Sequence, residues 1–521
     1  MTSFVDRFSA SIHGVLSGFD RIRFRGTQRL LASARGLTAF LAFRSVRLTE
    51  FKDYVTAVTA DIRRQVEAGA EQAGLAVAYV NDPSRSKEEL AADLAKRAGR
   101  ATGLRAILSA VEPCRTFFVR KNPATGHIEL QNRPGKCLHY YHYWLDERLG
   151  PCHLRLQTWF PFTLFVCVNG RDMLAGELAR QGIEHRRRDN CFTWVRDLPR
   201  AQALLDGQVT LDWSAELTRL LSASHPGWST WPGMDRPPYW SADETEWATD
   251  VMFRSRAGLS RLMPGLVEHA LVGLGCRDVL RFLGRPATGG VHPKFAGEAG
   301  TDLVKRPEGV RVAFRVNHNR VKFYDKQGSV LRVETTITDA RDLKSYRPKE
   351  GDPDGPKAWR RLKKGVSDLP RRTQISQTSN DRCLEALAAA ATDRTVGELT
   401  APVCAPEVWK GRPVRALNPL AADDQRLLRV VGRGEFLITG LRNRDVREAL
   451  YGSAPTDPAA AKRQSAAVTR KLRLLRAHGV IRKVAKTHRY QVTATGRELI
   501  TALTAACAAQ PKSLQNQGQA A

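Results

Sequence analysis

A short acidic segment in the middle of the chain carries residue types that bind divalent cations. It reads SADETEWATDVMFRSR over 241–256, and Ser241 followed three residues later by Glu244 predicts a helix that begins with a capping box. On such a helix, Glu246 and Asp250 lie one turn apart on one face, where two carboxylates can share Mg²⁺ or Mn²⁺. The alternative is structural: the acids complement the helix dipole, and Asp250 pairs with the arginine four residues on.

A second group of polar side chains lies in a predicted β-meander at 309–338. Strand alternation in the segment VKFYDKQGSVLRVETTI places Arg332 and Glu334 on one face. Leu331 and Val333 then occupy the other face. These charges either serve a polar site or are balanced by charges on neighbouring strands.

The motif YDK begins at Tyr324, and the motif R-x-E follows from Arg332 to Glu334. Together they resemble the hairpin of rolling-circle replication initiators of plasmids and filamentous phages. The early segment FDRIRFRG is similar to their first strand, in which an aspartate, here Asp20, lies among apolar residues. The resemblance implies metal-assisted phosphodiester cleavage by a tyrosine hydroxyl. It makes Tyr324 the candidate nucleophile and Asp20 and Glu334 candidate catalytic, metal-binding carboxylates. The candidate phosphate contacts are Lys322, Lys326 and Arg332.

Strand alternation in the early segment GFDRIRFR places Asp20, Ile22 and Phe24 on one face and three arginines on the other. The metal candidates are therefore Asp20, Glu334, Glu246 and Asp250. A DNA-processing site predicts that Asp20, Glu334 and one of the other two acids converge in a basic cleft, with Mg²⁺ or Mn²⁺ as the cofactor.

Cysteines and histidines gather in the predicted hairpin KCLHYYHYWLDERLGPCHLRL. The group consists of Cys137, His139, His142, Cys152 and His153. His139 and His142 point to opposite faces of a strand, unlike the His-hydrophobic-His pair of many replication initiators. Folding at DERLG would bring the two halves together and offer nitrogen and sulfur ligands to zinc. Because no spacing typical of zinc sites is present, we expect structural roles and no zinc.

The C-terminal segment 419–506 carries helix signals followed by two short strands. Helices are predicted at 423–431, at 443–450 and from an N-cap at Asp457 to Ala477; strands follow at 480–484 and 489–493, and a last helix starts near Thr495. This is the order of a winged helix-turn-helix, and SAAVTRKLRLLRAHGVIRKVAKTHRYQVTATGREL resembles the MarR-like family. The resemblance implies DNA binding and a homodimer.

The long helix of this segment is amphipathic. Val468, Leu472 and Leu475 share a face that must pack inside the module. The opposite arc and the predicted wing supply the candidate DNA-binding residues, which are Lys462, Arg463, Thr469, Arg470, Arg473, Arg476, Lys486, His488 and Arg489. Residues 411–500 hold 19 Lys and Arg against 7 Asp and Glu, a net charge of +12 that favours duplex DNA. The alternative is a solvated basic face on a protein-binding module.

Two further basic runs, HRRR at 185–188 and WRRLKK at 359–364, lie outside the C-terminal segment. Residues 301–372 have a net charge of +9, and Tyr346 and Trp359 are available to stack on unpaired bases. A solvated loop explains these runs equally well.

Composition narrows the class of protein. The chain has 521 residues and a formal charge of +29, which favours a polyanionic partner. Its longest strongly apolar run, Trp159–Val168, is too short to span a bilayer, and no apolar signal-peptide segment opens the chain. Nine scattered cysteines without a CxxC pair predict reduced thiols and a cytoplasmic location. We expect no membrane association.

These elements predict an α+β protein with a large region of mixed helices and antiparallel sheet and a C-terminal winged helix-turn-helix. Helices are expected at 50–73, 85–110 and 171–181, and β-rich pieces between Cys114 and Val168. The expected segments are an N-terminal strand and helical region at 1–110, a central α+β region at 111–398, a Pro-rich linker at 399–418, the winged module at 419–506 and a disordered tail at 507–521.

The combined signals predict a bacterial DNA-binding protein associated with a mobile element, plasmid or phage. Its large domain is expected to process DNA by metal-assisted phosphodiester cleavage or strand transfer. One alternative is a non-enzymatic winged-helix regulator whose large domain senses a ligand or oligomerises. Another is an RNA-binding protein.

Overall fold

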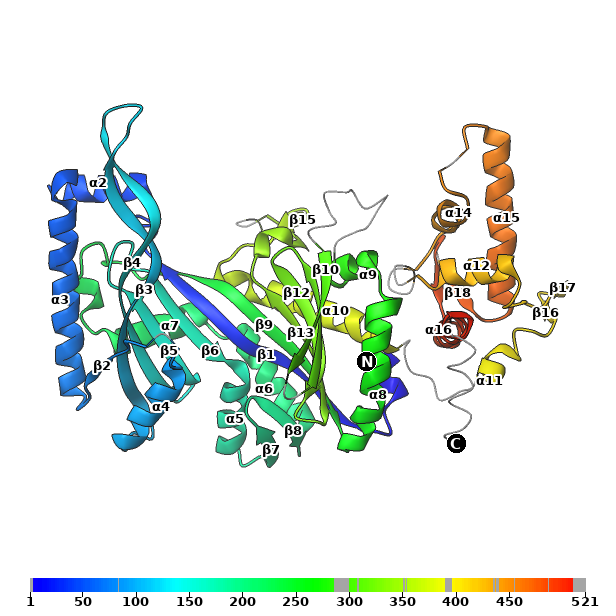
Figure 1. Ribbon diagram of the computed structural model, residues 1–521, viewed down its shortest axis with the longest axis horizontal. Coiled ribbons are helices and arrows are strands. Elements are labelled where there is room, and N and C mark those ends of the chain that lie inside the picture. Colours follow the sequence, from blue (N-terminus) through cyan, green and yellow to red (C-terminus); the bar gives the residue numbers. More distant parts are fainter. Residues whose placement is uncertain are drawn as a thin grey trace. The chain divides into compact units, whose positions relative to one another are not determined.

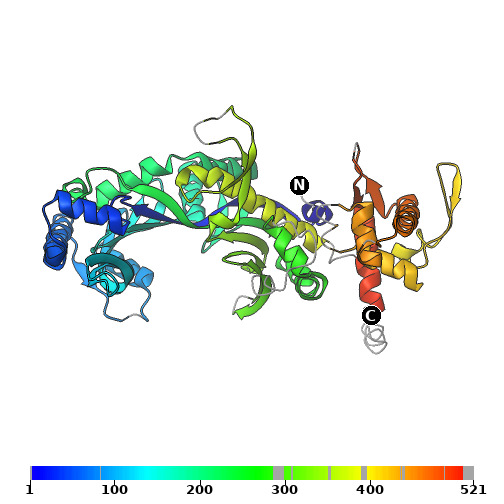
Figure 2. The ribbon, with the colours of Figure 1, turned by 90° about the horizontal axis from the view of Figure 1, so that it is seen from above.

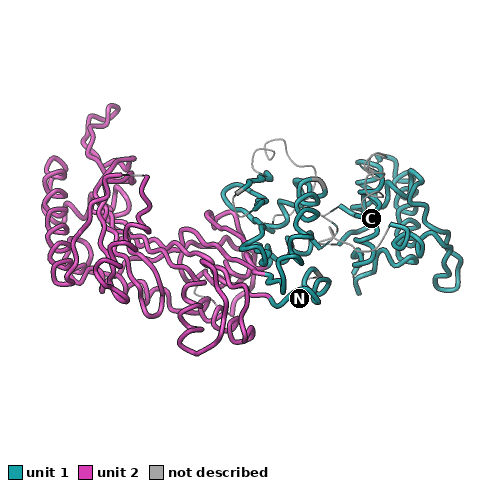
Figure 3. The backbone as a smooth tube through the Cα atoms, turned by 60° about the horizontal axis from the view of Figure 1, so that its bottom comes forward, with its two compact units in different colours: residues 1–14, 251–333, 378–521 teal, residues 15–250, 334–377 magenta. Residues whose placement is uncertain are grey.

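The computed structural model describes residues 3–82, 84–284, 299–306, 309–349, 352, 354–388, 396–433, 436, 440–453, 455–485 and 487–508. It is a mixed α and β protein, which confirms the expected α+β class. The chain divides into two compact units that interleave along the sequence (Figure 3). Unit 1 comprises Met1–Gly14, Val251–Val333 and Thr378–Ala521, and unit 2 comprises Val15–Asp250 and Glu334–Gln377.

One large sheet has the strand order β10-β11-β12-β13-β9-β1-β6-β5-β4-β3-β2. Its strands are β1 Ile12–Thr27, β2 Val77–Tyr79, β3 Gly103–Lys121, β4 Ile128–Asp146, β5 Gly150–Gln157, β6 Leu164–Asn169, β9 Tyr239–Phe253, β10 Ala299–Arg306, β11 Gly309–Val316, β12 Asn319–Lys326 and β13 Val330–Ile337. Pairing is antiparallel from β1 through β6, β5, β4 and β3, whereas β2 runs parallel to β3. β3 and β4 continue as a long hairpin in unit 2 (Figure 1).

Helices cover both faces of the sheet in unit 2. They are α2 Ala34–Phe43, α3 Phe51–Gln72, α4 Lys87–Arg97, α5 Gly170–Arg180, α6 Leu198–Thr210 and α7 Trp213–Ser224. Ile107 of β3 packs in the main core with residues of α2, α3 and α7, whereas its neighbour Leu108 packs in a second cluster with Ala91 of α4. Figure 2 shows α2 and α3 against the part of the sheet that contains β3 and β4. Successive strand residues therefore face different helices, as the two-residue period of a strand requires.

Shorter elements complete both units. In unit 2 these are η1 Leu48–Glu50, η2 Trp228–Thr230, η5 Ala340–Asp342, η6 Val366–Asp368 and the strand pairs β7 His185–Arg188 with β8 Cys191–Val195 and β14 Lys344–Arg347 with β15 Ala358–Arg361. In unit 1 they are α1 Ser3–Arg7, α8 Arg256–Glu268, the π-helix η3 His269–Gly273 and α9 Cys276–Phe282. Helix α10, Leu369–Leu387, contributes to both units.

The C-terminal module is the part of unit 1 from residue 396 onward. Its elements are α11 Val396–Thr400, β16 Glu407–Trp409, β17 Arg412–Val414, α12 Ala422–Val431, α14 Asn443–Tyr451, α15 Pro458–Ala477, β18 Ile481–Lys483, β19 Tyr490–Val492 and α16 Ala494–Ala508. One hydrophobic cluster joins these elements, and it includes Leu399, Val414 and Leu417 from the segment expected to be a linker. Segment 399–418 therefore carries its own elements and packs with the module.

Several predicted elements match the structure closely. α3 and α15 occupy the expected ranges, and the Asp457 carboxylate caps α15 by accepting hydrogen bonds from the backbone N–H groups of Ala459 and Ala460. Ser86 caps α4, and the meander at 309–338 consists of β11, β12 and β13. These elements carry strong helix caps or a clear hydrophobic period, so the sequence alone predicts them.

Two predicted helices are wrong. The segment that opens with Ser241 forms the strand β9, and the second half of the helix pair expected at 85–110 enters β3. β9 lies between β13 and β1, and almost all of its residues are buried. Tertiary pairing has overridden a capping signal that is favourable only for an isolated segment.

Among the described residues, no helix is both long enough and apolar enough to cross a membrane. None of the nine cysteines, all of which lie in the described part of the chain, forms a disulfide.

Candidate functional site

Three carboxylates from three adjacent strands meet in unit 2. Asp20 lies on β1, Glu246 on β9 and Glu334 on β13, and β9 lies between the other two strands. One carboxylate oxygen of each residue lies within 4.8 Å of those of the other two. The three residues, here called the acidic triad, are only 6%, 7% and 1% exposed. Oxygen ligands at this spacing suit Mg²⁺ or Mn²⁺.

Asp20 lies in β1, and its side chain is buried. Phe19, Ile22 and Phe24 all join the main core, although strict alternation would place Phe19 on the opposite face from Ile22. The side chains of Asp20 and Arg21, adjacent in sequence, both reach Glu246. From Asp20 to Arg25 the burial alternates as predicted: Asp20, Ile22 and Phe24 are buried, whereas the three intervening arginines are exposed.

Two donors hold triad carboxylates in place. Asn190 Nδ2 donates a hydrogen bond of 2.5 Å to Asp20 Oδ1. Arg21 Nη2 lies 3.2 Å from Glu246 Oε1 and 3.0 Å from Glu244 Oε1. Burial by itself lowers the pKa of Arg21, but the negative charges around it, led by that of Glu246 and including Glu334, outweigh burial and raise the pKa. Arg21 therefore stays charged beside the triad.

Asp250, the fourth predicted ligand, lies outside the triad. In a strand, residues four positions apart are separated by roughly 13 Å, so Glu246 and Asp250 do not share one ion. Asp250 instead forms an ion pair of 3.2 Å with Arg171, and both side chains are almost completely buried. Arg171 Nη2 also donates to the backbone carbonyl of Ala248 at 3.0 Å. The predicted pairing of Glu246 with Asp250 is wrong because the helix on which it depended is a strand.

The candidate nucleophile and phosphate contacts lie on β12 and β13 in unit 1. Tyr324 is half-buried on β12, opposite Arg311 of β11. Lys322 is 8% exposed, and its Nζ lies 5.8 Å from the centre of the Tyr324 ring. Lys326 is half-exposed, whereas Arg332 is buried. Of the phosphate candidates, Lys326 is the most accessible in this structure.

Helix α15 presents a basic face in the C-terminal module. Val468, Leu472 and Leu475 are buried as the wheel predicts. The exposed candidates on the helix are Lys462, Arg463, Thr469, Arg470 and Arg473. His488 and Arg489 are exposed between β18 and β19, and Lys486 lies outside the described residues.

Two candidates on α15 have partners inside the module. The Arg476 guanidinium lies 4.9 Å from the Trp409 ring centre and 5.9 Å from that of Tyr490, so this side chain packs against aromatics. Thr469 Oγ1 accepts a hydrogen bond of 2.9 Å from Asn443 Nδ2, which links α14 to α15. No local pattern marked Trp409 or Asn443, because their roles depend on tertiary contacts.

The cysteine and histidine group does not assemble as the hairpin suggested. His139 and His142 do face opposite sides of β4: His142 packs on His225 with ring centres 4.4 Å apart, and His139 lies beside Arg155. Cys152 joins the main core and His153 contacts Tyr143. Cys114 of β3, which no pattern marked, lies beside Cys137 and His139 instead.

The basic runs lie on two small hairpins. HRRR forms β7, and Arg186 lies 5.6 Å from the Trp194 ring centre. WRRLKK begins in β15, where the exposed rings of Tyr346 and Trp359 lie 5.5 Å apart. These two rings contact each other and remain open to solvent.

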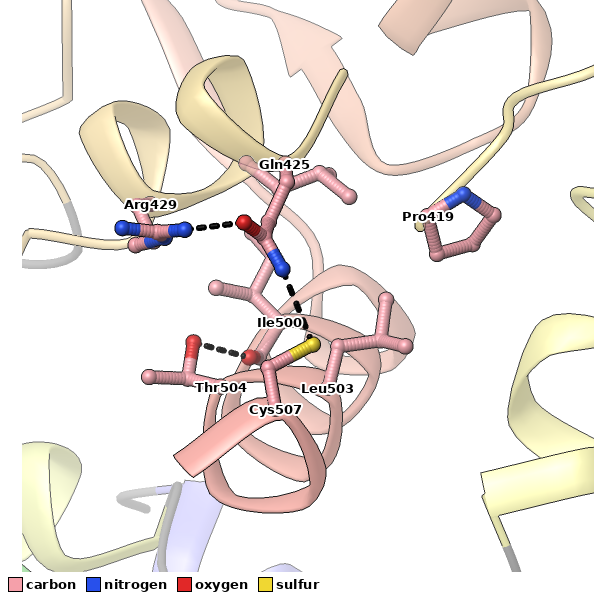
Figure 4. A pocket seen from close by; sticks show the side chains of 8 residues that line it. Pro419, Gln425, Arg429, Ile500, Leu503, Thr504 and Cys507 are labelled. Carbon is pink, nitrogen blue, oxygen red and sulfur yellow. Dashed lines mark hydrogen bonds between the residues drawn. The ribbon is translucent and has the colours of Figure 1, made fainter. Parts of the chain in front are cut away.

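A pocket of about 250 Å³ lies between α12 and α16 of the C-terminal module (Figure 4). Its lining residues are Pro419, Gln425, Leu428, Arg429, Ile500, Leu503, Thr504 and Cys507. Gln425 Nε2 donates toward Cys507 Sγ at 3.0 Å, and no carboxylate lines the pocket. The pocket therefore lacks the ligands of a hard cation.

No protein-family model, curated protein or solved structure matches this chain. The function must therefore be inferred from the chemistry of the acidic triad and of the basic module.

Proposed function

We propose that this protein is a DNA-processing protein that cleaves or transfers phosphodiester bonds with the help of Mg²⁺ or Mn²⁺. The acidic triad is the observation that carries this proposal. Asp20, Glu246 and Glu334 come from three strands, lie within 4.8 Å of one another and are at least nine-tenths buried. Carboxylates gathered at this spacing repel one another, and a divalent cation relieves that repulsion.

The residues around the triad suit such a site. Asn190 fixes the orientation of Asp20, and Arg21 fixes that of Glu246. Supporting hydrogen bonds of this kind orient metal ligands in proteins. A bound divalent cation would act as a Lewis acid on a phosphate oxygen.

Tyr324 is the proposed nucleophile. Its hydroxyl oxygen would attack phosphorus and form a phosphotyrosine bond. The tyrosine hydroxyl would give up its proton, the bond from phosphorus to the leaving deoxyribose oxygen would break, and that oxygen would take up one proton in exchange. The resemblance of the β12–β13 hairpin to replication initiators supports this role.

The C-terminal module is proposed to be a winged helix that binds duplex DNA. The order of α12, α14, α15, β18, β19 and α16 supports this, as does the exposed basic face of α15. Arginines on such a helix reach phosphates and guanine edges in the major groove. The net charge of +12 in residues 411–500 would draw the module to DNA at low salt.

A cleavage assay tests the proposal with a matched pair of variants. Supercoiled plasmid and single-stranded DNA are incubated with the full-length protein and Mg²⁺ or Mn²⁺. Glu334→Gln should slow cleavage by about 100-fold or more, because one ligand loses its charge. Glu244→Gln, which removes a nearby carboxylate outside the triad, should cleave nearly as fast as wild type. If the wild-type protein binds DNA but cleaves none of these substrates, the protein is a non-enzymatic DNA binder and the processing role is wrong.

A further inference from the structure

A pair of cysteines on neighbouring strands of unit 2 lies in sulfur contact. Cys114 Sγ on β3 and Cys137 Sγ on β4 are 3.3 Å apart. Cys114 pairs with Gly135 in the strand register, so Cys137 is its diagonal neighbour. Cys114 is partly accessible, whereas Cys137 is buried. A disulfide requires about 2.05 Å between the sulfurs, so a closing movement of little more than 1 Å would join them.

The two thiols differ in acidity. The hydrogen bond between the two sulfurs is the main cause that lowers the pKa of Cys114, and the positive charge of Arg155 adds to it. The same hydrogen bond, together with burial, raises the pKa of Cys137. Cys114 is thus the more acidic thiol of the pair and Cys137 the less acidic one. A partly accessible thiol of lowered pKa beside a second thiol is the arrangement of cysteines that react with peroxides.

A zinc site fits these atoms less well. Two thiolates bound to one zinc ion lie roughly 3.8 Å apart, given bonds of about 2.3 Å and tetrahedral angles. His139 Nδ1 hydrogen-bonds to the Cys137 carbonyl oxygen at 3.0 Å, which leaves Nε2 as the ligand atom. Arg155 Nη2 lies 3.4 Å from this Nε2, where a positive charge opposes a metal ion.

We propose that Cys114 and Cys137 form a peroxide-reactive thiol pair that closes to a disulfide. The Cys114 thiolate attacks one oxygen of hydrogen peroxide, the O–O bond breaks, and the leaving hydroxide takes a proton to become water. The product is a sulfenic acid at Cys114. The Cys137 sulfur then attacks the Cys114 sulfur, the S–S bond forms, the S–O bond breaks, and a second water leaves with the proton of Cys137. Two electrons pass from the two sulfurs to the peroxide.

Peptide mapping tests this pair in the full-length protein. The reduced protein is treated with hydrogen peroxide, its remaining thiols are alkylated, and it is digested with trypsin without reductant. The expected product is a disulfide between peptides 106–115 and 137–148, which carry the two cysteines. Cys114→Ser should abolish this product. Cys167→Ser, which removes another partly buried thiol of the sheet, should leave its yield unchanged.

A second set of variants separates the two steps. Cys137→Ser should accumulate a sulfenic acid at Cys114 that dimedone labels. Arg155→Gln should slow the loss of the Cys114 thiol by about fivefold, because the thiolate loses a cation. Far-UV circular dichroism verifies that each variant keeps its fold.

Absence of the linked peptide in the wild type would overturn the proposal, as would a preferred disulfide between other cysteines. Zinc analysis of the purified protein supplies a further decisive result. Zinc at one ion per chain that is lost in Cys137→Ser would replace the thiol pair with a metal site.

Discussion

Asp20 and Glu334 are 314 positions apart in the sequence, yet a carboxylate oxygen of one lies within 4.8 Å of a carboxylate oxygen of the other. Their strands, β1 and β13, are separated in the sheet by β9, which contributes Glu246 to the same group. Three buried acids brought together by strand order form the most specific chemical feature among the described residues.

The proposed nucleophile makes a separable prediction. Tyr324→Phe should abolish cleavage and the covalent protein–DNA adduct, because the ring keeps its shape but has no hydroxyl to attack phosphorus. Binding of Mn²⁺ should stay within about twofold of wild type, since the tyrosine is not a proposed metal ligand. Gel analysis of the adduct on labelled single-stranded DNA measures the first effect. Undiminished adduct in Tyr324→Phe would assign the nucleophile elsewhere.

The basic face of α15 should control DNA affinity and its salt dependence. Replacing Arg463, Arg470 and Arg473 by Ala should weaken duplex binding and reduce the slope of log affinity against log salt by about one unit per lost phosphate contact. Fluorescence anisotropy at several salt concentrations measures both quantities.

A matched control removes the same charge elsewhere. Replacing the exposed Arg47, Arg63 and Arg64, at or near α3, should leave the salt slope nearly unchanged. Equal effects of the two triple variants would show that net charge alone, and not the α15 face, binds DNA.

The buried ion pair should matter for stability. Asp250→Ala leaves the Arg171 guanidinium in the interior without its carboxylate, which should lower the free energy of unfolding by about 3–5 kcal/mol. Glu244→Gln, which alters a more exposed pair, should cost less than about 1 kcal/mol. Urea unfolding followed by tryptophan fluorescence compares the two. A decrease of less than about 1 kcal/mol in the free energy of unfolding of Asp250→Ala would mean that water reaches this ion pair.

Buried histidines should make the protein less stable in acid. Burial lowers the pKa of His142 to about 3, whereas the unfolded chain has a pKa of about 6.5. Between these values the unfolded state binds the extra proton, so the free energy of unfolding should fall as pH falls. The slope is about 1.4 kcal/mol per pH unit for one histidine.

Substitution isolates the contribution of this ring. Unfolding is measured between pH 7 and pH 4.5 in wild type and in His142→Gln, with the exposed His127→Gln as the control. The His142 variant should show a shallower pH dependence, and the control should match wild type. Identical slopes in all three proteins would contradict the account.

Local sequence signals predict the helices and strands that depend little on tertiary contacts. The N-cap at Asp457 and the apolar stripe through Val468 located α15, and the turn residues located the strands of the meander. Strand alternation also identified Glu334 as a polar residue on a strand that is otherwise rich in apolar side chains. These features depend on neighbours within a few residues, which a sequence displays directly.

The assembly of the triad depends on strand order, which the sequence does not display. Ser241 and Glu244 form a capping pattern that predicts a helix, whereas the burial of β9 between β13 and β1 is a tertiary effect. The sequence predicts Glu246 as a metal ligand only through a helical pairing with Asp250. The strand β9 does not allow that pairing. Asn190 gave no signal, because its hydrogen bond to Asp20 joins segments 170 residues apart.

Titration of the protein with Mn²⁺ followed by electron paramagnetic resonance tests the central claim most directly. The wild-type protein should bind one Mn²⁺ ion tightly, Glu334→Gln should weaken that binding by about 100-fold, and Glu244→Gln should leave it within about twofold. A wild-type protein that takes up no Mn²⁺, or a Glu334→Gln variant that binds it as tightly as wild type, would contradict the assignment of the acidic triad as a metal site.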